Sequence, residues 1–179
     1  MRSITMPGAL TLLAAILSVA PAASPNATPQ KKEYLSESEA DKIREAGATG
    51  PRIVLFATFA SDRIKKLRYE FAHLDPADQK RAERLNALIN GYAGCIDDAT
   101  DLIDIGIEKQ QDIRDGVKAM QTGLKEFLPY LKDLAMNGVE RETYKDNLED
   151  AIEATQDASA EVEKASKEMS ASPERRKPS

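Results

Sequence analysis

The 179-residue chain is poor in the residue types that most often carry chemistry, with one Cys, one His and no Trp. A single Cys excludes an intrachain disulfide, and a single His excludes a metal site built from several histidines. Covalent haem is excluded because no Cys-x-x-Cys-His motif occurs. No nucleophile elbow, phosphate-binding loop or zinc-binding helix motif is present either. We therefore expect a protein that is not an enzyme and that needs no cofactor.

The charge balance excludes a further class of function. The formal net charge is −5, and it becomes −6 when residues 1–22, which contain one charged residue, Arg2, are removed. General nucleic-acid binding depends on clustered Lys and Arg, so we expect no nucleic-acid partner. Hydrophobic residues make up 41% of the chain, which is too many for a wholly disordered protein.

The longest apolar run lies at the N-terminus and is typical of an export signal. Arg2 precedes about a dozen apolar residues, and Ala20 and Ala22 supply a small-x-small cleavage site. We expect cleavage after Ala22 or, as the second choice, after Ala23. The run is shorter than the ~20 residues of a membrane span, although an uncleaved N-terminal anchor helix is the alternative. The mature chain should be exported, periplasmic or extracellular, without a transmembrane segment.

Composition divides the rest of the chain into three parts. Residues 23–33 are rich in Pro and polar groups and predict a flexible leader. Residues 34–169 carry helical patterns throughout and form the predicted helical bundle domain. Residues 170–179 resemble the leader in composition and predict a disordered tail.

Four helices are predicted within the bundle domain. A capping box at residues 36–39 opens a short first helix, and a second helix covers 51–74. Asp75 is the expected N-cap of a third helix that covers 76–136, and the fourth covers 144–169. The apolar stripe of the third helix keeps 3–4 spacing throughout. Its members are Leu85, Leu88, Tyr92, Cys95, Ala99, Leu102, Gly106, Gln110, Ile113, Val117, Met120, Leu124, Phe127, Leu131 and Leu134.

These patterns predict an all-α antiparallel helical bundle dominated by a long coiled-coil-like helical hairpin. Gln110 is the one strongly polar residue of the long stripe, and a break in the third helix is expected, if anywhere, near residues 91–94. A reversal centred on residues 137–138 sets a register in which facing residue numbers sum to about 275. That register places Leu124 near Ile152.

Two kinds of candidate binding residue stand out. Asp97, Asp101, Asp104 and Glu108 repeat along one helix face and are the candidate ligands of a divalent cation. The same face lies opposite the apolar stripe, so a solvated acidic surface is the preferred interpretation. Cys95 lies within the apolar stripe beside acidic neighbours and is interpreted as a buried structural thiol, with an intermolecular disulfide as the alternative.

A second candidate site involves the only histidine. Glu70 and His73 have the Glu-x-x-His spacing of carboxylate-bridged metal bundles, but the chain offers no second such motif. We interpret His73 as a residue that interacts favourably with the C-terminal end of its helix.

Charge is distributed unevenly along the chain. Residues 63–84 hold seven basic and four acidic residues, whereas residues 97–115 hold two basic and seven acidic ones. A polarised molecule of this kind could dock on an acidic partner or on an envelope surface. Pairing of the charges within the molecule is the preferred alternative.

Residues 34–46, followed by 52–56 and 59–64, resemble the opening of uncharacterised exported bacterial helical proteins. The resemblance covers residues 34–64 and implies no activity and no site residues. We expect a non-enzymatic exported module that acts through a protein or envelope partner, as a monomer or weak homo-oligomer. The alternative is a periplasmic bundle that binds a small ligand or a divalent cation.

Overall fold

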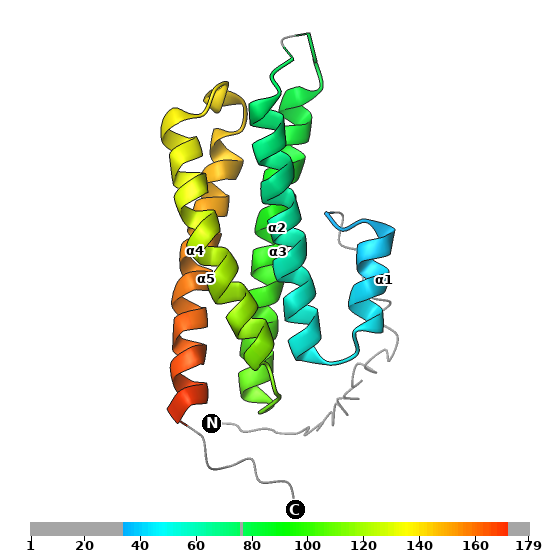
Figure 1. Ribbon diagram of the computed structural model, residues 1–179, viewed down its shortest axis with the longest axis vertical. Coiled ribbons are helices and arrows are strands. Elements are labelled where there is room, and N and C mark those ends of the chain that lie inside the picture. Colours follow the sequence, from blue (N-terminus) through cyan, green and yellow to red (C-terminus); the bar gives the residue numbers. More distant parts are fainter. Residues whose placement is uncertain (1–33, 76, 172–179) are drawn as a thin grey trace, which may run out of the picture. The chain divides into compact units, whose positions relative to one another are not determined.

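The computed structural model describes residues 34–75 and 77–171, and the described part contains helices and no strands (Figure 1). The helices are α1 (Glu37–Glu45), α2 (Thr49–Ala72), α3 (Arg81–Glu108), α4 (Arg114–Asn137), the short 3₁₀ helix η1 (Arg141–Thr143) and α5 (Lys145–Ala171). The predicted all-α helical bundle is confirmed. None of the helices in these two stretches combines the length and hydrophobicity that a membrane crossing requires. The predicted signal peptide, the leader and residues 172–179 of the tail lie outside the described residues.

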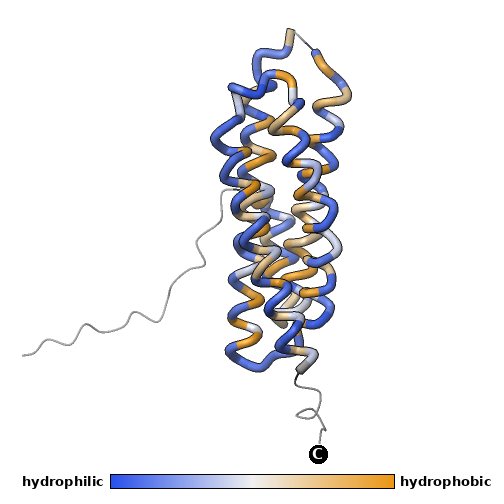
Figure 2. The backbone as a smooth tube through the Cα atoms, turned by 90° about the vertical axis from the view of Figure 1, so that its left-hand side faces the viewer, coloured by the Kyte–Doolittle hydropathy of each residue, from blue (hydrophilic) through white to orange (hydrophobic). Residues whose placement is uncertain are grey.

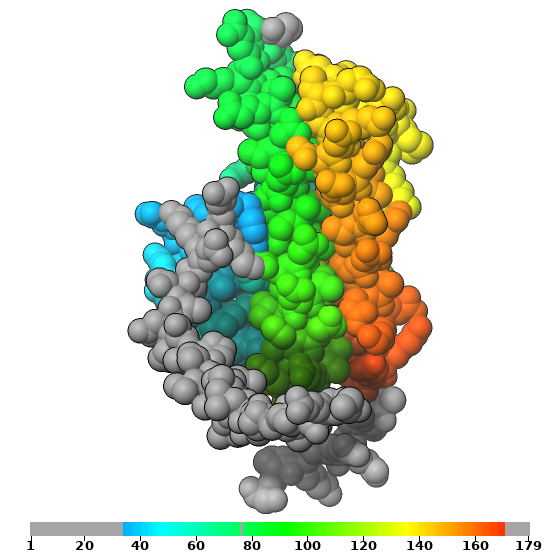
Figure 3. Space-filling model, turned by 180° about the vertical axis from the view of Figure 1, so that it is seen from behind, coloured from blue at the N-terminus to red at the C-terminus, as the bar shows by residue number. Residues whose placement is uncertain are grey.

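Helices α2 to α5 form the bundle as two antiparallel hairpins, α2–α3 and α4–α5 (Figure 1). The hairpins pack so that α2 lies beside α4 and α3 lies beside α5, and each of these pairs is parallel. Figure 3 shows α3 and α5 side by side along the face that it presents. Helices α3 and α4 follow one another in the chain, yet they face each other across the core. The rings of Tyr92 and Phe127 meet there edge to face, with centroids 5.7 Å apart.

The apolar stripes predicted from the sequence form most of this core. Figure 2 shows hydrophobic and hydrophilic residues recurring along every helix of the bundle. Burial of such stripes is the main stabilising contribution in a helical bundle. One buried polar contact crosses the core between α3 and α5. The hydroxyl groups of Tyr92 and Thr155, both almost fully buried, lie 2.8 Å apart and share a hydrogen bond.

The prediction of one helix over residues 76–136 is wrong, because the chain reverses between α3 and α4. The last turn of α3 ends in a Schellman motif, in which the N–H of Gln111 donates to the Gly106 carbonyl and the N–H of Gln110 donates to the Ile107 carbonyl. Gln110 occupies the left-handed region, with φ 52°, at the position where glycine is usual. The break therefore falls at residues 109–113, and the stretch 91–94 stays helical.

Close packing of backbone against side chain makes this reversal compact. A Cβ atom on Gly106 would lie 2.5 Å from Cγ2 of Ile113, the residue just before α4. Helix α4 approaches α2 equally closely, because a Cβ atom on Gly116 of α4 would lie 2.7 Å from Cβ of Ile53 of α2. Both positions need glycine because real Cβ atoms do not approach so closely.

The start of α3 also differs from the prediction. Helix α3 begins at Arg81, and Asp75 is not its N-cap. The Asp75 carboxylate instead accepts a hydrogen bond from the N–H of Ala77, at 2.9 Å, within the connection 73–80. Asp residues form such local turns as readily as helix caps, so the residue type does not distinguish the two.

The antiparallel arrangement of α4 and α5 is confirmed, but the predicted register is wrong. Helix α4 ends at Asn137 as expected, and seven residues, including η1, then separate it from α5. The longer connection displaces α5 by about two helical turns relative to a tight reversal. Leu124 consequently shares a groove with Val162 rather than with Ile152.

The reversal at residues 109–113 predicts opposite effects for two neighbouring glycine substitutions. Gln110→Gly should stabilise the protein by about 0.5–1 kcal/mol, because an L side chain in the left-handed region costs ~1–2 kcal/mol and glycine removes most of this cost. Lys109→Gly, at a residue with φ −85°, should destabilise it by about 0.5–1 kcal/mol through chain entropy. Urea unfolding measures both. If the helix were continuous across this stretch, both substitutions would be destabilising, and that result would contradict the reversal.

Candidate functional site

The four candidate cation ligands lie on α3 and are exposed. Asp97, Asp101, Asp104 and Glu108 follow one another along the helix surface. Across residues 34–75 and 77–171, no group of three or more His, Cys, Asp or Glu side chains converges as metal ligands would. These four residues thus form an exposed acidic face of α3.

One of these carboxyl groups has a specific environment. Partial burial and the nearby Glu161 carboxylate raise the pKa of Asp104. The ammonium group of Lys164 lies 2.7 Å from Glu161 Oε1 and lowers the pKa of Glu161. The acidic surface of α3 is thus partly balanced by the adjacent turn of α5.

Asp98 differs from its acidic neighbours because it is buried. Its carboxylate accepts a hydrogen bond from the Tyr34 hydroxyl group, which reaches it from the segment preceding α1. Burial raises the pKa of Tyr34, and the charges of neighbouring acidic groups add to this effect. Asp98 therefore anchors the N-terminal segment and does not belong to the solvated surface.

Two glycines of α3 make room for this N-terminal segment. A Cβ atom on Gly94 would lie 2.7 Å from the Tyr34 ring, and one on Gly91 would lie 3.5 Å from Arg63 Nε and 3.9 Å from Tyr34 Cβ. Leu35, the next residue, is buried against the core. We call residues 34–46 the arm.

The arm is held by an ion pair with a buried cation. Arg63 of α2 is only 7% exposed, and its guanidinium group donates to both carboxylate oxygens of Glu39 and to the Tyr34 carbonyl. These hydrogen bonds lower the pKa of Glu39 to about 2 and raise the pKa of Arg63. Glu39 also completes the capping box of α1, which confirms the prediction at residues 36–39. We call the surface formed by Arg63, Gly91, Gly94 and Asp98 the arm slot.

Cys95 is fully buried within the core beside the arm slot, as the sequence predicts. The thiol has no solvent access in the folded chain, so it offers no accessible nucleophile.

The Glu70–His73 pair does not form a metal half-site. The carboxylate of Glu70 accepts hydrogen bonds from Arg84, at 2.9 and 3.2 Å. The His73 ring stacks on Tyr69, with centroids 4.0 Å apart, and its Nδ1 lies 2.9 Å from the Tyr69 carbonyl. His73 occupies the C-cap position of α2, next to the carbonyl end of the helix, in agreement with its predicted role.

The basic residues of 63–84 are largely engaged within the molecule. Arg68 pairs with Glu126 at 2.9 Å, and Arg84 pairs with Asp78 at 2.6 Å. Arg81, which is buried, donates from Nε to Glu140 at 2.9 Å and from Nη1 to the Glu70 carbonyl at 2.6 Å. Internal pairing therefore accounts for much of the positive charge predicted for this region.

Arg81 also fixes the geometry of one end of the bundle. The connections 73–80 and 138–144 meet at this end, which we call the hairpin end (Figure 1). The Arg81 guanidinium group lies over the Phe71 ring of α2, 5.3 Å from its centroid, and pairs with Glu140 of the connection 138–144. A buried arginine with several partners holds its surroundings rigidly, since separating them leaves a charge unpaired.

Exposed apolar side chains are concentrated at the hairpin end. The exposed fraction is 71% for Met136, 62% for Tyr69, 52% for Leu74 and 46% for Val139. Ile105, near the opposite end, is exposed to 37%. A group of exposed apolar side chains around ordered polar residues is typical of a protein interaction surface.

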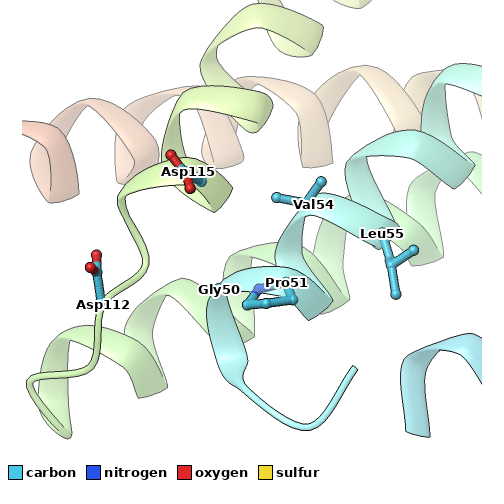
Figure 4. Close-up of a pocket in the computed structure, with 6 residues that line it drawn as sticks. All are labelled: Gly50, Pro51, Val54, Leu55, Asp112 and Asp115. Carbon is cyan, nitrogen blue, oxygen red and sulfur yellow. The ribbon is translucent and has the colours of Figure 1, made fainter. Parts of the chain in front are cut away.

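A surface pocket of about 560 Å³ lies at the opposite end, between the start of α2 and the start of α4 (Figure 4). Its lining residues are Gly50, Pro51, Val54, Leu55, Asp112 and Asp115. Figure 4 shows the apolar side chains on the α2 side and the two carboxylates on the other side. The Asp112 carboxylate pairs with Arg114 at 2.6 Å. No Ser, Cys or His side chain is among these lining residues, so they include no nucleophile with a neighbouring base.

The Glu39–Arg63 ion pair predicts a pH-dependent contribution of the arm to stability. Because the pKa of Glu39 is lowered from 4.5 to about 2, this contribution is present above pH ~4.5 and is lost as the pH falls towards 2. Glu39→Gln should reduce the free energy of unfolding by about 1.5–3 kcal/mol at pH 7, the value of a charged hydrogen bond. Urea unfolding of both proteins at pH 7 and pH 3 should show a smaller difference at pH 3. An equal difference at both pH values would contradict the ionised pair.

The two glycines of the arm slot predict different results for the same substitution. Gly91→Ala introduces only ordinary contacts and should stabilise α3 by up to about 1 kcal/mol, from helix propensity. Gly94→Ala places a methyl group against the Tyr34 ring, so this gain should be offset and the arm should loosen. Hydrogen exchange of residues 37–45 should become several-fold faster in Gly94→Ala and should not change in Gly91→Ala. Identical exchange in the two variants would show that the ring does not occupy the slot.

Protein-family models, curated proteins and solved structures gave no match to this chain. The resemblance carried by residues 34–64 stays a prediction.

Proposed function

We propose that this protein is a non-enzymatic exported helical module that docks on a protein partner through its hairpin end. The observation that carries the proposal is the concentration of Tyr69, Leu74, Met136 and Val139, each about half exposed or more, at that end. Apolar side chains exposed in this way are costly in water unless a partner covers them. Export is proposed from residues 1–22, whose pattern is that of a cleaved signal peptide.

The rigidity of the hairpin end supports this proposal. Arg81 ties the connection 138–144 to α2 and α3, and the Tyr144 hydroxyl group donates to the Val139 carbonyl at 2.8 Å. The exposed side chain of Val139 is therefore presented from an ordered framework. A preorganised surface loses less conformational entropy on binding than a flexible one.

The alternatives have less support. An anionic envelope surface requires free positive charge, whereas Arg68, Arg81 and Arg84 of this region are paired with acidic side chains. A small ligand could use the pocket of about 560 Å³ at the opposite end. The polar side chains of that pocket are two carboxylates, and one of them is already paired with Arg114.

Photo-crosslinking tests the docking surface. A photoreactive amino acid at position 136 should capture a defined partner from the exported fraction, and the same probe at Ile105 should not. Leu74→Ser with Val139→Ser should abolish capture at position 136 while changing the free energy of unfolding by no more than about 0.5 kcal/mol, as is usual for surface sites. Capture that is equal at both positions, or unaffected by the double substitution, would contradict the proposed surface.

The export part of the proposal has a separate test. The intact mass of the mature protein should correspond to a chain that starts at Ala23 or Ser24. A chain that retains Met1 in the membrane fraction would contradict export by a cleaved signal.

A further inference from the structure

The arm is attached to the bundle by few but specific contacts. Helix α1 itself contributes no buried residue, and it packs on α2. The apolar contacts that hold the arm are the Tyr34 ring against Gly94, and Leu35 and Ile43 against the core. The polar contacts are the Tyr34 hydroxyl group on Asp98, the Tyr34 carbonyl on Arg63 and the Glu39 carboxylate on Arg63. A nine-residue helix of this kind is not stable by itself in water, so the arm is ordered only where a slot receives it.

The arm slot belongs to the most rigid part of the bundle. Its four residues lie on α2 and α3, the helix pair with the most extensive mutual packing. The recess at Gly91 and Gly94 results from missing side chains on a regular helix. The recess therefore belongs to α3 itself and does not depend on the residues of the arm.

A short hinge connects the arm to the bundle. Residues 46–48 separate α1 from α2, and Gly47 has φ 64°, which a glycine adopts without strain. Rotation about these few residues moves the arm as a unit and leaves α2 unchanged. Segments with a small number of specific contacts and a short hinge are the ones that proteins exchange between copies.

We infer that residues 34–46 are an exchangeable arm, which docks in the arm slot of a second copy of this chain. The occupant follows from complementarity, because the slot offers a recess for an aromatic ring, a buried cation for a carboxylate five residues later, and the Asp98 carboxylate for a phenolic hydroxyl group. The arm of a second copy carries all three groups at the required spacing. The inference is independent of the proposed docking at the hairpin end, which involves other residues.

The concentration dependence of the exchange follows from the hinge. A short tether gives the chain's own arm an effective concentration on the order of 1 mM, so the monomer dominates in dilute solution. Exchange becomes substantial as the protein concentration approaches that value. At lower protein concentrations, a disulfide bond that forms between two exchanged chains accumulates and makes the exchange detectable.

Disulfide trapping between two different variants tests the exchange. One variant carries Tyr34→Cys and the other carries Gly91→Cys, both with Cys95→Ser. Tyr34 Cβ lies 3.9 Å from a Cβ atom built on Gly91, within the ~3.5–4.5 Å range of disulfides. Mixed at about 0.1–1 mM with a mild oxidant, the two variants should give a mixed covalent dimer on a non-reducing gel.

Two controls make the result decisive. Tyr34→Cys and Gly91→Cys in the same chain should crosslink within the monomer, and failure to do so would overturn the placement of the arm. A partner with Glu83→Cys, exposed in the first turn of α3 and outside the arm slot, measures crosslinking by random collision. A mixed dimer several-fold more abundant than this control supports exchange, and a yield equal to the control overturns it.

A charge exchange provides a second test without cysteines. Glu39→Arg in one chain and Arg63→Glu in another place like charges together within each monomer, whereas exchanged arms restore opposite charges in both slots. Native mass spectrometry of the mixture should show a heterodimer that neither variant forms alone. The double variant Glu39→Arg, Arg63→Glu restores opposite charges within one chain and should behave as the unmodified protein does. If the mixture contains only folded monomers, the arm is not exchanged.

Discussion

The arrangement of the bundle depends on the reversal that ends α3 at residues 109–113. Gln110 takes a left-handed conformation and Gly106 admits the Ile113 side chain, so the chain turns back within five residues. Because the reversal directs α4 to the far side of the core, α2 lies beside α4 and α3 lies beside α5. A continuous helix through this stretch would leave the stripes of α2 and α5 without their present partners.

The apolar stripes and the capping box at residues 36–39 were predictable from the sequence, whereas the reversal at residues 109–113 was not. Burial follows from local spacing, so Cys95, Val117 and Leu131 are found in the core as expected. The spacing from Gly106 through Gln110 and Ile113 to Val117 happens to keep one helical phase across the break. Glycine usually marks a Schellman motif, and here Gln110 fills that position. Gln110, the one strongly polar residue of the stripe, was the feature of the sequence that indicated the reversal.

The arm slot was missed for a related reason. Glycine has a low helix propensity, so residues 91–94 were interpreted as a possible break in the helix. The structure uses them for a close approach of Tyr34 and Arg63 to α3. The partners come from distant parts of the sequence, and no periodic pattern relates Glu39 to Arg63 or Tyr34 to Asp98. The exposed acidic residues of α3 were predictable because their positions depend only on the phase of their own helix.

Two buried arginines fix the positions of peripheral segments, which the packing of the apolar stripes does not determine. Hydrophobic burial specifies which face of each helix turns inward, but it is non-directional and does not fix where a peripheral segment lies. A buried guanidinium group does fix it, because leaving such a charge without partners costs several kcal/mol (~3–5). Arg63 positions the arm through Glu39, and Arg81 positions the connection 138–144 through Glu140. The positions of the arm and of the hairpin end therefore depend on these ion pairs rather than on the packing of the core. Release of the arm breaks the Glu39–Arg63 ion pair, the hydrogen bonds made by Tyr34 and the apolar contacts of Tyr34 and Leu35. In the inferred exchange, the arm of a second copy of the chain restores the same contacts.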